Sequence, residues 1–181
     1  MKNFLILVTV LILFAGCEEK NIKPIIMEAV DTERIPVQES WNSQIIFSEN
    51  GDKQAILFAD HIIVYEDEEE KAKHLEGVKI NFYDNDGSIS SVLTSKRGKV
   101  DDVTNDMYAI DSVVAVSDSG VVLETDELLF RKKDNKIVSD RFVTITSDDE
   151  KIEGYGFESD QGLDNYTIFN ITYYTRLEKS K

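Results

Sequence analysis

The stretch Val78-Lys-Ile-Asn-Phe-Tyr-Asp-Asn-Asp-Gly87 decides the fold class. Apolar and polar residues alternate from Val78 to Phe82, which is the period of a strand with one dry face and one wet face. An acidic turn that ends in glycine follows at once, and a second apolar stretch begins at Ile89. This pattern is typical of a β-hairpin.

The same pattern occurs at three further places in the chain. The four segments are Ile45–Gly51, Val78–Gly87, Ser112–Gly120 and Phe142–Glu150. The second strands are expected to end in Phe58–Asp60, Thr94–Ser95, Thr125–Asp126 and Phe157–Asp160, so each repeat is predicted to be a hairpin plus one further strand. A single hairpin is barely stable in water, so the hairpins must share an apolar face. The predicted fold is all-β, an elongated, twisted antiparallel β jelly roll built from repeated hairpins.

Proline usage sets the limits of this domain. Both prolines, Pro24 and Pro36, precede Trp41, and β-branched and aromatic residues dominate after it. We therefore expect a tether over residues 17–40 and the β jelly-roll domain over residues 41–181.

The N-terminus has the layout of a secretory signal. A short apolar run from Phe4 to Phe14 is followed by two small residues and Cys17. The run is too short to span a bilayer, which needs about 20 apolar residues. This arrangement resembles the lipobox of bacterial lipoproteins, so residues 1–16 are expected to be a lipoprotein signal peptide and Cys17 the lipid-attachment site. An ordinary secretory peptide with a chance cysteine is the alternative.

The composition argues against a nucleic-acid partner and against stabilisation by disulfide bonds. The formal net charge is −15, which argues against a nucleic-acid partner because phosphate contacts need a basic surface. Cys17 is the only cysteine, so no disulfide within the chain can support the fold. The apolar core must therefore hold the domain together alone.

Few residues have the spacing of a catalytic or metal site. His61 and His74 have no cysteine or second histidine at ligand spacing, so both are expected at solvated or edge positions, and no metal or cofactor is predicted. Asp84–Ser88 looks like the start of a calcium loop, but a strand resumes at Ile89, which favours a hairpin turn. The acidic run Glu66–Glu70 is expected to be an exposed loop. The chain has no serine elbow or phosphate loop, so no enzyme activity is expected.

The apolar alternates of the predicted strands are expected to point to one side of the sheet. They are Val78, Ile80, Phe82, Val114, Val116, Val121, Leu123, Val143 and Ile145. Such a face can be a sealed core, which periodicity favours, or it can line a channel for acyl chains between two sheets that part. The sequence leaves both alternatives open.

With its anchor and repeated hairpins, the chain resembles the LptC family of lipopolysaccharide export proteins from about Pro24 to Tyr174. The segments that carry the resemblance are Pro36–Phe47, Gly87–Ser95 and Ile152–Asp160. The resemblance implies a protein on the periplasmic side of the inner membrane. It would bind lipopolysaccharide in an apolar groove and relay it from an inner-membrane ABC transporter to an LptA-like bridge protein. A lipobox stands here in place of the family's transmembrane helix, and retention at the outer membrane stays open.

Strand edges are the expected contacts to these partners, because an unpaired edge can add a neighbour's strand through main-chain hydrogen bonds. By the resemblance, the first repeat faces the transporter and the last strand faces the bridge protein. The edge residues are Ile45, Ile46, Phe47, Tyr166, Ile168, Asn170 and Thr172.

Two other functions stay open. One is a periplasmic scaffold lipoprotein with a sealed sheet, which binds protein partners only. The other is an enzyme that acts on envelope glycans with carboxylates such as Asp84, Asp86 or Glu153, although nothing in the spacing selects a catalytic pair.

Overall fold

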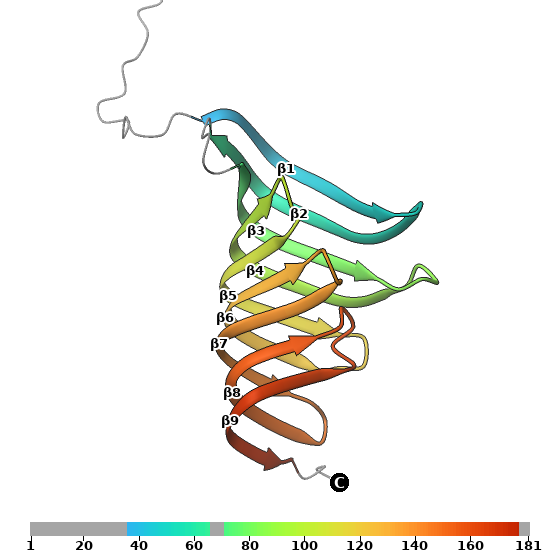
Figure 1. The fold of residues 1–181 in the computed structure, drawn as a ribbon, viewed down its shortest axis with the longest axis vertical. Helices are drawn as coiled ribbons and strands as arrows, with labels where there is room; N and C mark the ends of the chain where they lie inside the picture. Colours follow the sequence, from blue (N-terminus) through green and yellow to red (C-terminus); the bar gives the residue numbers. More distant parts are fainter. Residues whose placement is uncertain (1–35, 66–70, 178–181) are drawn as a thin grey trace, which may run out of the picture. The chain divides into compact units, whose positions relative to one another are not determined.

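The structure, a computed structural model, describes residues 36–65 and 71–177, and every regular element in them is a β-strand. The strands are β1 (Pro36–Glu49), β2 (Asp52–Tyr65), β3 (Ala72–Tyr83), β4 (Ile89–Asp101), β5 (Met107–Ser117), β6 (Val122–Arg131), β7 (Lys136–Thr146), β8 (Glu150–Ser159) and β9 (Tyr166–Arg176). They form one nine-stranded antiparallel sheet in sequence order (Figure 1). The predicted all-β hairpin fold is confirmed. β1 begins at Pro36, inside the stretch expected to be a tether, while the signal peptide, Cys17 and Glu66–Glu70 lie outside the described residues.

Tight turns join the strands of the four repeats where the sequence predicts them. In the β1–β2 turn, Asn50 and Gly51 both have positive φ, 54° and 94°, as in the two-residue turns that match the twist of paired strands. In the β3–β4 turn, Asp86 Oδ1 accepts hydrogen bonds from the backbone N–H and the hydroxyl of Ser88, at 2.9 and 2.6 Å. Asp84–Ser88 is thus a hairpin turn, as predicted.

The strands from β2 to β9 are each irregular near the middle. Regular pairing breaks at Asp60, Gly77, Thr94–Arg97, Ile110–Val113, Thr125–Leu129, Ser139–Phe142, Gly156 and Thr172. A β-bulge bends the strand that carries it, and the bends gather on one side of the stack, at the left in Figure 1. We call the part of the sheet that carries the four repeat turns the hairpin half, and the part that carries the other connections the loop half.

The bulges correct the predicted repeat unit. The predicted strand ends at Thr94–Ser95 and Thr125–Asp126 lie at bulges, and Phe58–Asp60 lies at a break in the pairing opposite Gly77; these strands continue to Asp101, Arg131 and Tyr65. The fourth predicted end, Phe157–Asp160, is correct, since β8 ends at Ser159. A repeat is therefore two long bent strands, and the prediction of a third strand was wrong. A bulge interrupts the alternation of polar and apolar residues as a strand end does, so the sequence pattern alone did not separate the two.

The two halves of the sheet face each other. The rings of Phe82 on β3 and Phe130 on β6 have centroids 5.3 Å apart, although β4 and β5 lie between these strands in the sheet. Neighbouring strands are spaced by about 4.8 Å, so three steps along a flat sheet would separate the rings by about 14 Å. The sheet therefore folds over along the line of bulges.

The core fills the space between the halves. The hairpin half contributes Ala55, Leu57, Ala59, Val78, Ile80, Phe82, Leu93, Val113, Ala115, Leu123, Val143 and Ile145; the loop half contributes Ile62, Leu75, Val100, Met107, Ala109, Leu128, Phe130, Ile137, Phe157 and Leu163. Each large apolar side chain contributes about 1.5–3 kcal/mol when fully buried. This burial is the main stabilising term of the domain.

Candidate functional site

Most of the predicted apolar face lies in this interior. Its buried members are Val78, Ile80, Phe82, Leu123, Val143 and Ile145, each 3% exposed or less. Val121 packs against the same cluster beside the β5–β6 turn. The sequence therefore located a large part of the interior of the folded sheet.

Val114 and Val116 lie on the opposite side of β5, so their predicted place on the shared face was wrong. Val116 is 39% exposed, whereas Val113 and Ala115 are each 1% exposed. This stretch is apolar at every position, so alternation could not fix its phase. The bulge at Asp111–Ser112, where both residues have positive φ, sets the phase in the structure.

Sequence alternation also missed part of the interior. Leu57, Leu128, Ile137 and Phe157 are each 1% exposed. Leu57 lies in a run of five apolar residues and Leu128 is followed by a second apolar residue, so alternation is absent at both. Ile137 and Phe157 lie in short segments beside the bulge between β7 and β8. The strand register identifies Leu57 as an interior residue, because it pairs directly with the buried Ile80 and paired residues point to the same face of the sheet.

The β8–β9 loop, residues 160–165, begins and ends in the loop half and reaches over to the hairpin half. Ser91 Oγ on β4 donates a hydrogen bond to the carbonyl oxygen of Gln161 at 2.5 Å. Leu163 is 1% exposed and belongs to the core cluster. The loop thus covers part of the interior and places one side chain in it.

Carboxylates gather around this loop. Asp160 Oδ1 accepts a hydrogen bond from the backbone N–H of Asp164 at 2.9 Å. Burial raises the pKa of Asp164, and the charges of Asp160, Asp118 and Asp84 raise it further. Within the described residues, no cluster has the arrangement of metal ligands. The neighbouring carboxylates thus raise the free energy of the charged form of Asp164.

β1 and β9 are the two edges of the described sheet, as predicted. Most of their predicted contact residues face the core in part: Ile45, Phe47, Tyr166 and Ile168 pack against it. Ile46 is 55% exposed, and Asn170 and Thr172 are also exposed. Burial raises the pKa of Tyr166, whose hydroxyl lies 3.3 Å from Glu150 Oε1.

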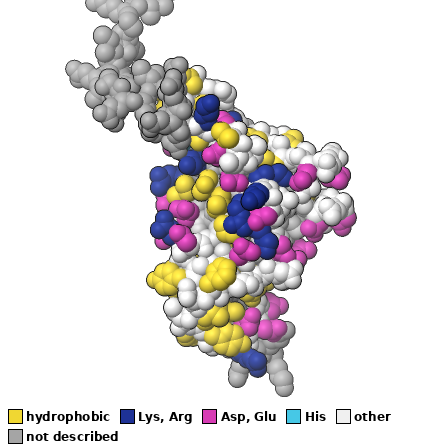
Figure 2. Space-filling model, viewed as in Figure 1, with side chains coloured by type: hydrophobic (Ala, Val, Ile, Leu, Met, Phe, Trp, Pro, Cys, Tyr) yellow, Lys and Arg dark blue, Asp and Glu magenta, His cyan; other side chains and the backbone are white. Residues whose placement is uncertain are grey.

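The β9 edge is rich in exposed aromatic residues, and Figure 2 shows hydrophobic side chains at the surface near the C-terminal strands. We call these exposed residues at the β9 edge the β9 patch; they lie on both faces of the edge, since Tyr173 and Tyr174 are neighbours in the strand, and they are Phe142, Tyr155, Phe169, Ile171, Tyr173 and Tyr174, each 41–64% exposed. The rings of Phe142 and Tyr155 pack edge to face with centroids 5.2 Å apart. Exposed apolar surface of this kind marks a site of interaction when it is contiguous.

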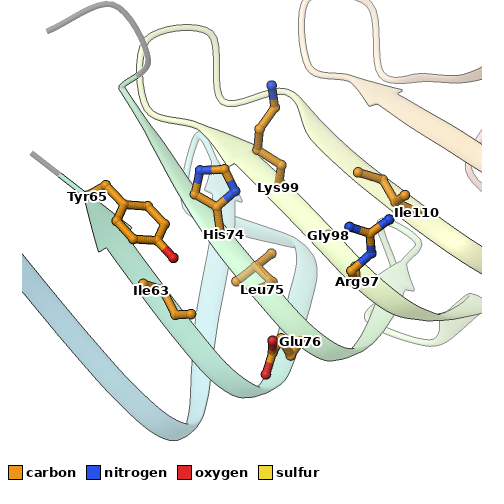
Figure 3. Close-up of a pocket in the computed structure, with 9 residues that line it drawn as sticks. All are labelled: Ile63, Tyr65, His74, Leu75, Glu76, Arg97, Gly98, Lys99 and Ile110. Carbon is orange, nitrogen blue, oxygen red and sulfur yellow. The ribbon is translucent and has the colours of Figure 1, made fainter. Parts of the chain in front are cut away.

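A recess of about 410 Å³ lies on the outer side of β2 to β5 (Figure 3). His74 stands between Ile63 and Lys99 in the strand register. Arg97 Nε donates to Asp111 Oδ2 at 2.7 Å, and this hydrogen bond raises the pKa of the guanidinium. The charge of Arg97 is thus balanced within the protein.

Both histidines lie on this outer side and are partly exposed, close to the solvated positions predicted. His61 lies between Glu39 and Glu76, at 3.1 and 3.4 Å, and stacks on Trp41 with centroids 5.0 Å apart. His74 meets the ring of Tyr65 edge-on. His61 therefore links side chains of β1, β2 and β3.

A comparison with protein-family models adds to this picture of a folded sheet with an apolar interior and two edges. Residues 4–172 match the family model described as "Lipopolysaccharide-assembly, LptC-related". The chain belongs to this family. No curated protein matches the chain significantly.

Membership of the LptC-related family implies a role in lipopolysaccharide assembly and transport. Proteins of the LptC family are transport components, not enzymes, and work in the periplasm in association with the inner membrane. In residues 36–65 and 71–177 of this LptC-related chain, no helix has the length and hydropathy needed to cross a membrane.

Proposed function

We propose that this LptC-related protein binds the acyl chains of lipopolysaccharide between the two halves of its folded sheet. The observation that carries the proposal is the continuous apolar interior, which receives side chains from β2 to β8. Acyl chains that enter it leave water at a gain of about 0.8 kcal/mol per methylene. The polar sugars stay outside in water.

The two edges provide the direction of the relay. β1 adds to a strand of the inner-membrane ABC transporter, and β9 adds to a strand of an LptA-like bridge protein, since both edges have main-chain groups available for a further strand. A lipid on Cys17 holds the protein at the periplasmic side of the inner membrane. The transporter supplies the energy, because a binding groove alone only equilibrates lipid between its two sides.

A scaffold that binds protein partners only is the second candidate. The specific observation in its favour is the degree of burial, because Phe82, Leu123 and Val143 are all 0% exposed. In a scaffold these side chains would stay sealed in the core, and only the edges would bind.

Photocrosslinking in living cells distinguishes the two candidates. A photoreactive residue replaces Ile80, which is buried, or its neighbour Lys79, which faces outward. We expect covalent capture of lipopolysaccharide at position 80 and none at position 79. If the folded protein captures no lipopolysaccharide at position 80, and none at another interior position such as Leu123, the scaffold is favoured.

The polarity of the edges has its own test. A photoreactive residue at Ile46 on β1 is expected to capture the transporter, and one at Ile168 on β9 the bridge protein. Capture of the transporter from position 168 would reverse the proposed direction.

A further inference from the structure

Leu163 is unusual among the core residues because it comes from a loop. Its side chain is 1% exposed, although the next two residues, Asp164 and Asn165, are exposed. Its φ is +61°, in the left-handed region that L-residues with a side chain rarely adopt. Such a conformation persists only where the surroundings hold it, and here the burial of the side chain does so.

Most hydrogen bonds of this loop are internal to it: Asp160 accepts from the backbone N–H groups of Asp164 and Asn165 and from the side-chain amide of Asn165. Ser91 Oγ donates to the carbonyl of Gln161, and the N–H of Leu163 donates to the carbonyl of Asp160 at 3.4 Å. Asp164 lies close to the charges of Asp160, Asp118 and Asp84, which repel one another. Apolar burial therefore favours the closed loop while strain and charge oppose it, as expected of an element with two accessible positions.

We infer that Leu163 is a plug that fills part of the lipid-binding interior when no lipid is bound, and that an entering acyl chain displaces it. The inference rests on the proposed function, and it explains how an interior so fully buried can still accept a ligand. Methylene groups of the acyl chain take over the apolar contacts of Leu163 with the core. The loop then relaxes its backbone and separates its carboxylates.

A disulfide across the closed loop tests the plug. A Cβ built on Gly162 lies 3.8 Å from Cβ of Ser90, which is the usual separation in a disulfide. Its close contact, 2.8 Å, is with the carboxylate oxygen of Asp164, the end of a flexible side chain that can move. The hydroxyl of Ser90 is buried and makes no hydrogen bond, so replacing it sacrifices none.

The experiment uses the full chain in cell membranes with a photoreactive residue in place of Ile80. In the Ser90→Cys/Gly162→Cys variant, we expect capture of lipopolysaccharide to be at least ten-fold lower when the disulfide is formed than after reduction. The single variants Ser90→Cys and Gly162→Cys control for pairing with Cys17, and their capture should not depend on reduction. Mass spectrometry of the captured and uncaptured chains verifies the bond.

The outcomes separate the plug from the proposed function. Equal capture by the oxidised and the reduced double variant overturns the plug and leaves lipid binding in place. No capture by the parent chain, which carries only the photoreactive residue, overturns lipid binding itself and the plug with it.

A second pair of variants tests the plug without a disulfide. Leu163 is 1% exposed, whereas Leu129 on β6 is only partly buried and lies outside the core cluster. Leu163→Ala is expected to raise the rate of capture several-fold, whereas Leu129→Ala, on the outer face of the sheet, leaves the rate unchanged. Equal rates for the two variants would overturn the plug.

Discussion

The two edges of the sheet differ in how their exposed apolar residues are arranged. On β1, Val37, Trp41 and Ile46 are separated along the strand, and Trp41 is covered on one face by His61. The end of β1 is also tied to the rest of the domain, since Lys132 donates to Glu49 at 2.8 Å. The β1 edge is therefore partly occupied by contacts within its own domain.

On β9, the exposed residues Phe169, Ile171, Tyr173 and Tyr174 crowd into one strand and continue onto the neighbouring strands as the β9 patch. No charged residue occurs between Tyr166 and Thr175. Edges that must stay free usually carry charges that prevent strand addition. The comparison teaches that β9 has the composition of an edge that a partner covers, while β1 is suited to a weaker contact.

The largest expected effect concerns the attachment of β9. A Cβ at Gly154 would lie 2.4 Å from the carbonyl oxygen of Asn170 and 2.7 Å from Ile168 Cγ2, so Gly154→Ala must push β9 away from β8. We expect the free energy of unfolding to fall by about 3 kcal/mol, measured by denaturant titration.

The matched control lies at the other edge. Gly51 in the β1–β2 turn has nothing within 4 Å of an added Cβ, but its φ is +94°, so Gly51→Ala is expected to cost about 1–2 kcal/mol through backbone strain alone. Equal losses for the two variants would mean that close approach of β9 does not depend on Gly154.

A smaller effect is expected on binding at the β9 patch. Phe169→Lys combined with Tyr173→Lys removes two exposed aromatic residues and adds charge to the edge. We expect the affinity for a purified LptA-like bridge protein to fall by about 2 kcal/mol, or roughly 30-fold, in a titration with the membrane-inserted chain.

The corresponding change on β1 sharpens the comparison. Val37→Lys combined with Ile46→Lys also replaces exposed apolar residues and should leave the affinity for the bridge protein unchanged. A comparable loss of affinity from the β1 variant would show that the two edges are not specialised.

The smallest effects concern pH, and they have opposite signs at the two ends of the sheet. Beside β1, the hydrogen bond from Lys132 lowers the pKa of Glu49. A lowered pKa stabilises the folded state above the unfolded value of 4.5 and loses this contribution as the pH falls through the folded value. Glu49→Gln should therefore slightly lower stability at pH 7 and flatten the acid limb of the pH–stability curve.

In the β8–β9 loop, burial and neighbouring carboxylates raise the pKa of Asp164. A raised pKa favours the folded state below the unfolded value of 3.8 and loses this contribution as the pH rises through the folded value. Asp164→Asn should thus slightly raise the melting temperature at pH 7. A lower melting temperature at pH 7 for both Glu49→Gln and Asp164→Asn would contradict the opposite signs of the two pKa effects.

Local patterns predicted much of the fold, and they failed where distant residues decide the geometry. The turn at Asn50–Gly51 and the strand from Val78 to Phe82 were predicted correctly, because turn chemistry and alternation depend on neighbours in sequence. The side on which Val116 lies was not, because the residues from Val113 to Val116 are all apolar. The lipid contacts of the interior and the partners of the edges stay predictions.

The sequence by itself determined the hairpins, the order of the repeats and the apolar character of the strands, since each depends on a short stretch of chain. Only the tertiary structure decided that the sheet folds over at its bulges, that Phe82 meets Phe130, and that Leu163 enters the core from a loop. The reason is physical: these features arise from packing between residues far apart in sequence, and the same alternation of side chains would fit a flat sheet equally well.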